Sequence, residues 1–414
     1  MALLLLAQQG KISLDDPLRK YLPELPDYGA PLTVRHLRSH TGGLREWRLV
    51  ARFSGTPEGT YVLDNQDLFR IAAKQRALNF DPGTAYSYTN TGFNIATILL
   101  ERALNNGTTF QEFTRKAIFE PLGMTHTQWR DDIRAIVPNR ALAYAPKAAG
   151  WTKATPIENI FGAGGMLSTV GDWLRWNENF THAKVGGPEV VKQQETPATL
   201  TNGKTIGYAA GLVVNKVDGL REVSHGGATG GYRTWLGRYP EKAVSVAVLC
   251  NSAQANPVLL GRETARFWTG SVPAPKPVPA VVELPTLEKL AGMFRNLRDN
   301  SVAEFRVREN KLVRGNFALV PLNSTEFSLG QSKYRFQNDR LIEVTLDGDV
   351  TYKRVELAHP SAAELSALVG QYTSPEIGNN PLAFTAQAAQ LSLVIGSAPP
   401  IHLRWTPWAR HESK

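Results

Sequence analysis

Two short polar runs in this 414-residue chain combine side chains that could take part in acyl transfer. Tyr88-Thr89-Asn90 lies in the run PGTAYSYTNTGF, and His225-Gly226-Gly227 lies in SHGGATGGY. A phenol such as that of Tyr88 has a pKa near 10, so it acts as a base at neutral pH only when nearby cations favour the phenolate. The amide of Asn90 can donate a hydrogen bond to a substrate. Glycines in a strand leave its edge bare, so that a substrate backbone can approach closely.

The same chemistry requires a nucleophile, and the sequence does not supply one in a recognisable pattern. An acyl-transfer enzyme needs a nucleophile, a base and an oxyanion hole. No serine in the chain is followed by a lysine three positions later, and no Gly-x-Ser-x-Gly elbow is present. Ser39 and Ser87 lie near the segments discussed above, but neither has a lysine one helical turn on. The sequence therefore predicts a substrate-holding site without an identified attacking hydroxyl.

Six segments resemble the class C β-lactamase-like serine hydrolases, a family related to penicillin-binding proteins, and especially its esterase and D-aminopeptidase branch. Any one of them would be weak evidence, but the six occur in the family's order and spacing and together span Met1 to about Gly270. They are GKISLDDPLRKYLP (10–23), TVRHLRSHTGGL (33–44), FDPGTAYSYTNTG (80–92), EPLGMTHT (120–127), GAGGMLSTVGD (162–172) and the stretch around His225.

The resemblance assigns expected roles to the catalytic residues. Tyr88 matches the tyrosine of the family's second motif, which works as a base together with a lysine. Asn90 would bind the substrate and tie the tyrosine loop to that lysine. His225 stands where many β-lactamases have the lysine of Lys-Thr-Gly, and a histidine there is typical of esterase-like and D-aminopeptidase-like members. The backbone N–H of Ala228 would complete the oxyanion hole.

Three glycines are expected to line the substrate-binding cleft. Gly226 and Gly227 would lie along the substrate backbone, and Gly164 belongs to a glycine run that the resemblance places in a wall of the cleft. That run could also suggest a phosphate loop, but no Gly-Lys-Ser/Thr follows it. Without the family pattern, the residues themselves would favour reading Tyr88 as a packed aromatic residue and Asn90 as a turn residue.

In the family, the first motif is Ser-x-x-Lys, and it lies upstream of the other two. The opening run MALLLLAQQGKISLDD resembles the sequence that directly follows it. We therefore expect Met1 to be an internal helix residue, with the catalytic serine and lysine encoded upstream, and the chain as given to be inactive. Two alternatives stay open: a non-catalytic member that binds ligands or peptides, and a C-terminal barrel that binds a small ligand.

Helix, strand and turn signals along the chain predict an α+β architecture. Residues 1–270 are expected to form a β-lactamase/transpeptidase-like domain, an antiparallel sheet flanked by helices, with strands between 206 and 251 and a helix from Asn256 to Trp268. A Pro-rich linker covers 271–284. Alternating strands in 285–358 resemble the lipocalin-like barrel often appended to these hydrolases, and 359–414 forms a second, incomplete β repeat.

The division of the C-terminal part into two units is based on a weak sequence repeat. Leu287–Arg295 and Leu365–Thr373 share the pattern L-x-x-L-x-G-x-aromatic. The repeat suggests two related β units in this part of the chain.

Composition limits the possible partners. The net charge of +9 comes from dispersed basic residues without an aromatic-interleaved stripe, which argues against nucleic-acid binding. No apolar run is long enough to span a bilayer. His36 and His40 have the spacing of metal ligands on a helix, but the resemblance places them at a helix end and loop, so we expect neither metal nor cofactor. The expected partner is a small-molecule or peptide substrate. Oligomeric state and localisation stay open, although family members are often periplasmic or secreted.

Overall fold

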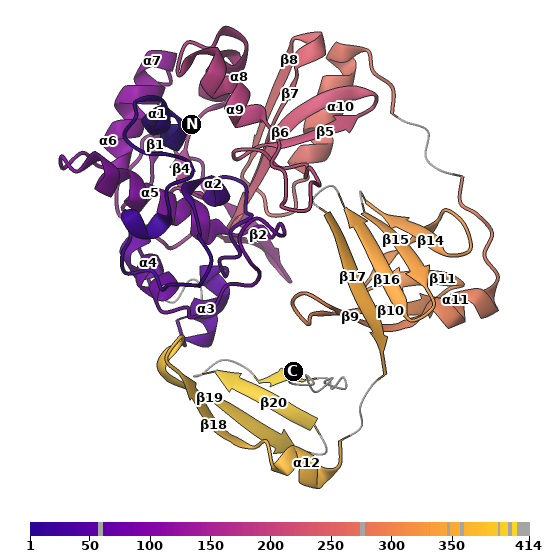
Figure 1. Ribbon diagram of the computed structural model, residues 1–414. Helices are drawn as coiled ribbons and strands as arrows, with labels where there is room; N and C mark the ends of the chain where they lie inside the picture. Colours follow the sequence, from indigo (N-terminus) through magenta and orange to yellow (C-terminus); the bar gives the residue numbers. More distant parts are fainter. Residues whose placement is uncertain are drawn as a thin grey trace. The chain divides into compact units, whose positions relative to one another are not determined.

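The protein is described here by a computed structural model, shown in Figure 1. The structure describes residues 1–56, 61–273, 278–330, 332–345, 348–356, 360–387, 390–395 and 400–403. The chain divides into two compact units, the first formed by residues 1–52 and 56–274 and the second by 53–55 and 275–414. In the described part of the chain, no helix is both long and apolar enough to cross a membrane.

The first unit begins with helices around one apolar core. Helix α5 contributes the fully buried Ile95, Leu99 and Leu100, and Thr89 caps its N-terminus by accepting a hydrogen bond from the Thr91 N–H. The helices are α1 (Ala2–Gln8), α2 (Val34–Leu37), α3 (Trp47–Phe53), α4 (Asn65–Ala73), α5 (Asn90–Leu104), α6 (Phe110–Thr114), α7 (Glu120–Leu122), α8 (Val170–His182) and α9 (Gly187–Glu195), with a 3₁₀ turn at Leu18–Lys20 and a π turn at Arg115–Phe119.

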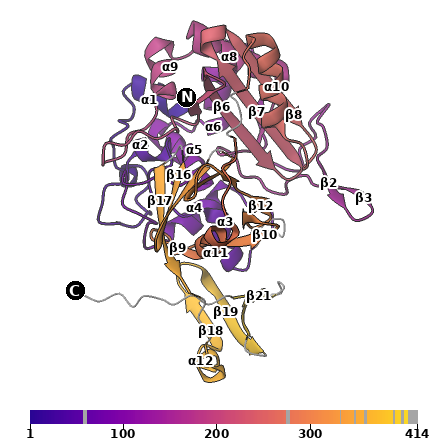
Figure 2. The ribbon, with the colours of Figure 1, turned by 90° about the vertical axis from the view of Figure 1, so that its right-hand side faces the viewer.

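A four-stranded antiparallel sheet follows in the order β5-β6-β7-β8. Its strands are β5 (Val213–Val217), β6 (Leu220–Thr229), β7 (Tyr232–Tyr239) and β8 (Val244–Cys250), with a 3₁₀ turn at Pro240–Lys242. Helix α10 (Pro257–Thr269) packs on the sheet (Figure 2) through a cluster that includes Trp235 and Ala265. Two glycines make room for the Trp235 indole, since a Cβ at Gly237 or Gly261 would stand 2.0 or 2.2 Å from it.

Strand β6 is paired on its β5 side over only half of its length. It pairs with β5 from Leu220 to Ser224, and with β7 from Val223 to Thr229. From His225 onward, no described strand lies on the β5 side. This free edge coincides with the segment that carries the predicted site residues.

The expected strand character of residues 206–251 is correct for 213–217, 220–229, 232–239 and 244–250, but wrong for the first seven residues. Residues 206–212 form an irregular turn, with Gly211 at φ +81°. The turn folds back on β5, because Val214 donates its N–H to the Gly207 carbonyl at 2.8 Å. Glycine at a left-handed position ends the extended run. This turn carries Tyr208 towards β6.

Two of the family-like segments are joined by one buried carboxylate. Asp172 on α8 is fully buried, and its Oδ2 accepts from the His126 N–H and from Thr127 Oγ1, both at 2.8 Å. The same region holds the two-stranded pair of β1 (Gln128–Trp129) and β4 (Met166–Leu167). A hairpin of β2 (Tyr144–Lys147) and β3 (Gly150–Lys153) lies between them in the sequence.

The second unit contains a nine-stranded antiparallel sheet in the order β12-β11-β10-β9-β17-β16-β15-β14-β13. The two end strands, β12 and β13, are separated in the chain by Leu319 alone, so the sheet curls into a nearly closed barrel. Helix α11 (Leu284–Leu290) precedes β9 (Gly292–Asn296), β10 (Val302–Arg308), β11 (Lys311–Arg314), β12 (Phe317–Ala318), β13 (Val320–Pro321), β14 (Glu326–Leu329), β15 (Ser332–Gln337), β16 (Arg340–Thr345) and β17 (Gly348–Val355).

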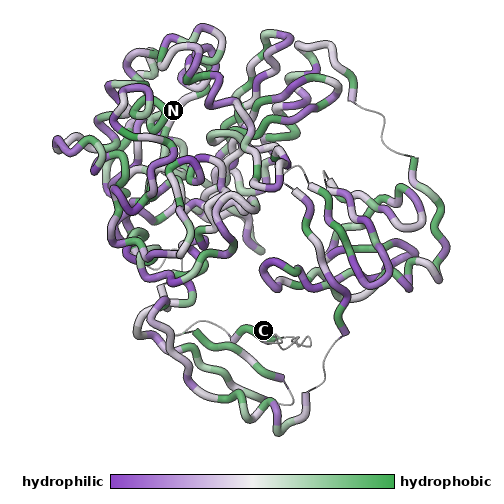
Figure 3. Tube along the Cα trace, viewed as in Figure 1, coloured by the Kyte–Doolittle hydropathy of each residue, from purple (hydrophilic) through white to green (hydrophobic). Residues whose placement is uncertain are grey.

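Aromatic rings fill the barrel. Phe294, Phe305 and Phe336 are buried and pack edge to face, with ring centroids 5.3–5.8 Å apart. Figure 3 shows apolar and polar residues interspersed along these strands, as expected for strands with one face in a core. The hypothesis of a ligand cavity in the barrel required open interior positions, and the packing of the described residues argues against it.

A separate four-stranded sheet, in the order β18-β19-β20-β21, follows the barrel. Both copies of the sequence repeat fold into a short helix followed by a strand that begins with glycine: α11 and β9 in the first copy, α12 (Ala362–Ser366) and β18 (Gly370–Ser374) in the second. The remaining strands are β19 (Gly378–Gln387), β20 (Gln390–Ile395) and β21 (Ile401–His402).

Candidate active site

The fold brings the two polar sequence runs together. Tyr88 lies two residues before α5, and His225 lies on β6 where the paired half of that strand ends. The two rings are tilted against each other with centroids 6.3 Å apart. Tyr208, from the turn before β5, stands beside both, with centroid distances of 6.2 Å to Tyr88 and 5.9 Å to His225. Residues distant in the sequence therefore form one aromatic, titratable cluster at the free edge of β6.

The Glu46 carboxylate holds the loop that carries Tyr88, through Thr89 and Asn90. Its Oε2 accepts from the Asn90 N–H at 2.7 Å, from Asn90 Nδ2 at 3.3 Å and from Thr89 Oγ1 at 3.1 Å. A carboxylate at the first residues of a helix also interacts favourably with the helix dipole. Asn90, predicted as a substrate-binding residue, therefore has its amide nitrogen directed to Glu46, and its amide oxygen is left for another donor.

The hydrogen bonds of His225 determine its tautomer. Its Nδ1 lies 2.7 Å from the Gly226 carbonyl, which can only accept, so Nδ1 carries the proton. In the neutral ring Nε2 is then an acceptor, and the Tyr208 hydroxyl at 3.0 Å donates to it. Burial lowers the pKa of His225 below its ordinary value. His225 is thus a neutral imidazole near pH 7, held in one orientation by Tyr208.

His40 lies at the centre of the aromatic cluster. Its ring centroid is 4.2 Å from that of Tyr88 and 4.6 Å from that of Tyr208, and the residue is 3% exposed. Nδ1 accepts from the Thr89 N–H at 3.3 Å, so Nε2 carries the proton, and that buried atom has no hydrogen-bond partner in the described part of the chain. Burial, and then the proximity of His225, lower the pKa of His40 to about 3.

The environment of Tyr88 favours the phenol over the phenolate. Partial burial and the carboxylate of Glu46 raise the pKa of Tyr88, and Arg48 acts in the opposite direction. The side chain is nevertheless 47% exposed, so its hydroxyl can be reached from solvent. Tyr88 is therefore protonated at neutral pH in this arrangement and would need an additional cation to act as a base.

The predicted backbone positions lie on the free half of β6. Gly226, Gly227 and Ala228 are exposed and follow His225 directly along the strand. A Cβ at Gly227 would stand 2.6 Å from Thr234 Oγ1 on β7, so glycine is favoured there by the neighbouring strand as well as by access. At Gly226, the nearest atom to such a Cβ would be the Thr234 carbonyl oxygen at 3.5 Å, an ordinary contact.

The glycine run at 162–165 packs on the first turns of α5. A Cβ at Gly162 would stand 2.5 Å from Thr97 Cγ2, and one at Gly165 would stand 2.6 Å from the Ile160 carbonyl oxygen. Both residues also have positive φ, so glycine is required at these two positions. Gly164, the residue predicted to line the substrate, faces open space.

Three residues of the cluster were not predicted as site residues from the sequence. Glu46 and Tyr208 lie outside the two polar runs, and nothing in their local sequence marks them. His40 was considered only as a metal ligand; the structure instead gives Nδ1 of His40 to Thr89, and Nδ1 of His36 to the Thr33 N–H at 3.2 Å. His40 has φ +57°, outside any helix, which a histidine adopts infrequently and which could have drawn attention to it only once the backbone was known.

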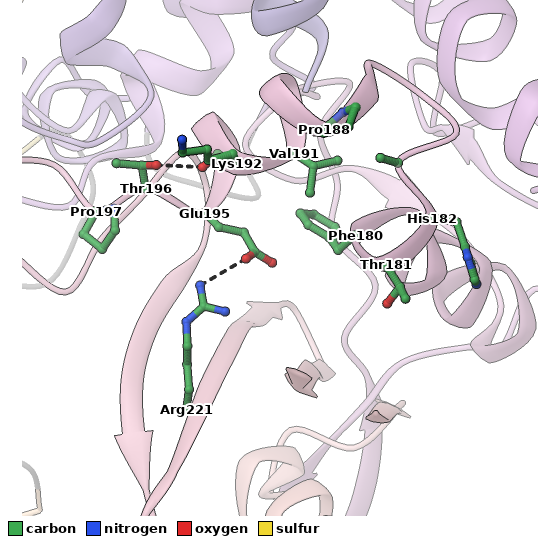
Figure 4. Close-up of a pocket in the computed structure, with 11 residues that line it drawn as sticks. Phe180, Thr181, His182, Pro188, Val191, Lys192, Glu195, Thr196, Pro197 and Arg221 are labelled. Carbon is green, nitrogen blue, oxygen red and sulfur yellow. Dashed lines mark hydrogen bonds and ion pairs between the residues drawn. The ribbon is translucent and has the colours of Figure 1, made fainter. Parts of the chain in front are cut away.

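A hollow of about 570 Å³ lies elsewhere in the first unit (Figure 4). It is lined by the end of α8, by α9 and by Arg221 at the start of β6, and includes none of the predicted site residues. In Figure 4, Glu195 points to Arg221, and the ion pair measures 3.0 Å; Glu195 also binds Arg238. Its central charges are thus compensated within the protein, and we assign no chemistry to this hollow.

Comparison with known proteins gives the family. A family model described as Beta-lactamase matches residues 1–267. Penicillin-binding protein 4* of Bacillus subtilis is 26% identical over 271 residues, which cover 61% of this chain and 58% of that protein. A D-aminopeptidase of Gluconobacter oxydans is 29% identical over 245 residues, 58% of this chain and 45% of that protein. The chain thus spans about half the length of the curated relatives it matches.

Solved structures agree in fold. The octameric penicillin-binding protein homologue from Pyrococcus abyssi superimposes with a TM-score of 0.60 at 22% identity, covering 84% of this chain and 85% of that one. A D-stereospecific amidohydrolase from Streptomyces sp. gives 0.57 at 22% identity, covering 66% and 83%. The expected β-lactamase/transpeptidase-like fold is confirmed. Since the family model matches more than half of the sequence, the chain belongs to the Beta-lactamase family.

Proposed function

We propose that this chain provides the substrate-binding and proton-relaying part of a serine hydrolase that cleaves an ester, amide or D-peptide bond through an acyl-enzyme. The observation that carries the proposal is the meeting of Tyr88 and His225, with ring centroids 6.3 Å apart, at the free edge of β6. Family membership and relatives named as D-aminopeptidase and D-stereospecific amidohydrolase support it.

The free edge of β6 suits an extended substrate. Backbone groups on an unpaired strand edge bind an added strand through main-chain hydrogen bonds. A substrate backbone lying along Gly226 and Gly227 would bring its reacting carbonyl towards the N–H of Ala228, the proposed oxyanion donor. The absence of side chains at the two glycines allows this close approach.

Tyr88 and His225 would then take part in proton transfer. Because burial and Glu46 raise the pKa of Tyr88, its hydroxyl is protonated at neutral pH, and a cation next to it would lower that pKa and let the phenolate act as a base. His225 keeps its proton on Nδ1 and accepts a hydrogen bond from the Tyr208 hydroxyl at Nε2. The Tyr208 hydroxyl and the His225 imidazole would therefore form a fixed proton relay at the site. Asn90 would bind the substrate through the amide oxygen that Glu46 leaves available.

The nucleophile is not among the residues assigned here. The 414 residues contain no Ser-x-x-Lys, and we propose that these residues alone form no acyl-enzyme. A fluorophosphonate probe is expected to leave the purified chain unlabelled, and p-nitrophenyl butyrate to be turned over no faster than in buffer. Labelling of a serine within the 414 residues would contradict this part of the proposal.

The hydrolase assignment is tested by supplying the motif. A Ser-x-x-Lys helix of the family joined in frame before Met1 is expected to give turnover of at least one of three substrates: a p-nitrophenyl ester, a D-alanine p-nitroanilide or a β-lactam. Tyr88→Phe should then lower kcat by roughly 10²–10⁴-fold, the usual contribution of a positioned acid or base. Tyr86→Phe, a nearby tyrosine in the same aromatic cluster, is the matched control and should retain activity. Full activity of Tyr88→Phe would refute the role of Tyr88.

A second candidate function, non-catalytic binding of peptides, is favoured by the combination of a free strand edge and the absence of Ser-x-x-Lys. It predicts that D-peptides bind to the chain without covalent labelling. It further predicts that adding the motif gives a well-folded protein without turnover, an outcome that separates it from the hydrolase.

A further inference from the structure

Three arginines form a cluster next to the site: Arg130 is buried, and Arg48 and Arg140 are half-buried. Arg48 of α3 binds both oxygens of Glu158, at 3.1 and 3.2 Å. Arg130 reaches the same carboxylate only at 3.6 Å and donates one further long bond, 3.5 Å, to the Pro156 carbonyl. Glu158 is itself buried. Glu158 therefore pairs with both Arg48 and Arg130, and Arg48 also lies 4.0 Å from Glu46.

Arg130 is 5% exposed, and its Nε and Nη2 have no hydrogen-bond partner in the described part of the chain. Arg140 adds two further buried atoms of the same kind, Nε and Nη2, and no described carboxylate lies within 4.0 Å of it. A guanidinium cannot lose its proton to relieve this situation, because its pKa exceeds 12. Burial of a charge without a partner costs several kcal/mol. Arg130 is thus only loosely paired, with Glu158 at 3.6 Å, and Arg140 pairs with no carboxylate in the described part of the chain.

The cluster borders the candidate active site. Burial lowers the pKa of Arg130, Glu158 and Tyr232 oppose that effect, and Arg140 and Arg48 add to it. Tyr232 begins β7, directly after the turn that follows the free half of β6, and its hydroxyl donates to the Ala141 carbonyl, next to Arg140, at 2.6 Å. At the other end of the cluster, Arg48 lies 4.0 Å from Glu46, the carboxylate that binds the Asn90 N–H beside Tyr88. The arginines therefore lie between the Tyr88 loop and the β6–β7 turn.

We propose that Arg130 and Arg140 form an oxyanion-binding site, whose ligand is a carboxylate carried by the substrate or a free carboxylate or phosphate. Guanidinium N–H groups match the geometry of both anions and bind them through paired, charge-assisted hydrogen bonds. The position beside the free edge of β6 suits an acidic group at one end of an extended substrate. This substrate assignment rests on the function proposed above, whereas the binding of a free anion does not.

Titration calorimetry on the full chain tests the site without requiring turnover. Three probes are used: inorganic phosphate, N-acetyl-D-alanyl-D-alanine and the C-terminal amide of that dipeptide. The variant is Arg140→Gln, chosen because Arg130 is too deeply buried to replace safely. Arg134→Gln is the matched control, since the Arg134 side chain is 85% exposed and pairs with Asp132 at 2.9 Å.

If the anion belongs to the substrate, the free acid binds at least about tenfold more tightly than the amide, and Arg140→Gln removes that difference while Arg134→Gln keeps it. If the anion is free, phosphate binds with an affinity that Arg140→Gln lowers about tenfold, and the two dipeptide forms bind alike. Either result supports the site. If phosphate binding depends on Arg140 but no dipeptide binds, the site stands and the proposed function is weakened.

Thermal unfolding supplies a second measurement. Phosphate should raise the Tm of the wild type more than that of Arg140→Gln. The proposal is overturned if none of the three probes distinguishes Arg140→Gln from Arg134→Gln and the two variants also unfold at the same temperature with and without phosphate.

Discussion

Two clusters in the first unit use the same kinds of side chain in opposite ways. In the sheet, fully buried Glu222 accepts from Arg262 at 2.8 and 2.9 Å, from the Tyr239 hydroxyl at 2.7 Å and from Ser224 Oγ at 3.1 Å. Both oxygens of that carboxylate are occupied by protein donors. This cluster ties α10 to β6 and β7.

At the candidate active site, by contrast, some buried hydrogen-bonding groups have no partner in the described part of the chain. Glu46 has one oxygen that accepts three hydrogen bonds and another, buried, that accepts none in the described part of the chain, although Arg48 lies 4.0 Å away. Nε2 of His40 is likewise buried and has no hydrogen-bond partner in the described part of the chain. Buried polar groups are normally hydrogen-bonded, so unsatisfied groups gathered at one place fit the proposal that this cluster binds a ligand. The comparison separates a cluster that is satisfied within the protein from one with unsatisfied groups.

The largest effect is expected in the satisfied cluster. Glu222→Ala removes a fully buried carboxylate, leaves the half-buried Arg262 guanidinium without its partner and should cost about 3–5 kcal/mol of unfolding free energy. Chemical denaturation monitored by circular dichroism measures it. The control is Glu263→Ala. Glu263 follows Arg262 on α10, but its side chain is 62% exposed, so its loss should change the stability by less than about 1 kcal/mol. Equal effects of the two variants would mean that the Glu222 cluster contributes no special stability.

A pH dependence of stability should come from the open cluster. The pKa of His40 is about 3 in the folded protein, against 6.5 for an ordinary histidine, so the unfolded chain binds the extra proton first. Stability is therefore unaffected above about pH 6.5 and falls as the pH decreases from there towards 3, by at most about 1.4 kcal/mol per pH unit from this residue.

His40→Asn tests that slope, because asparagine tolerates the positive φ of this position. Denaturation midpoints between pH 7 and pH 4 should fall less steeply in the variant than in the wild type. His36→Asn, a less deeply buried histidine nearby, is the control for a general loss of histidines. An unchanged slope in His40→Asn would show that His40 is not the group that titrates.

A smaller change is expected for Tyr208→Phe. The variant loses the hydroxyl that donates to Nε2 of His225, so the stability should fall by about 0.5–1.5 kcal/mol. The informative measurement is the ¹⁵N NMR spectrum of the His225 ring, in which the preference for the Nδ1–H tautomer should weaken. Tyr86→Phe should leave that spectrum unchanged. A tautomer ratio that is the same in Tyr208→Phe would assign the orientation of His225 to Gly226 alone.

The smallest effect on stability, and a clear one on titration, is expected for Glu46→Gln. The carboxylate raises the pKa of Tyr88, so its neutralisation should lower that pKa. Ultraviolet difference titration of the phenol, with Tyr88→Phe to identify its contribution, measures the change. Glu120→Gln, on the exposed helix α7, should have no effect. A rise in the Tyr88 pKa would contradict the electrostatic description of the site.

Much of the fold was predictable because local signals are strong in this sequence. The apolar strands after residue 212 and the helix expected from Asn256 to Trp268 depend on signals within a few residues, and both elements form as expected. The prediction failed at 206–212, where the strand-like composition is overridden by Gly207 and Gly211. The barrel and the following sheet also begin with the same local pattern, a short helix and a glycine-led strand.

The candidate site was predictable only in part, for a physical reason. Tyr88, Asn90 and His225 could be named because their short runs match a family pattern, and the structure places Tyr88 and His225 together. Glu46 and Tyr208 could not be named, since each becomes part of the site only through a contact with a residue distant in the sequence. The same holds for Arg130 and Arg140, which read as ordinary surface arginines in the sequence.

The sequence by itself determined the helices, the strands, the family and the identity of two polar runs, because capping, periodicity and glycine act locally along the chain. Only the tertiary structure decided which polar groups are satisfied. Whether a carboxylate or a guanidinium is compensated depends on what lies within about 4 Å of it in space and on how much water it has lost, and neither quantity is encoded in neighbouring residues. Glu222 and Glu46 are therefore alike in the sequence and different in the folded protein.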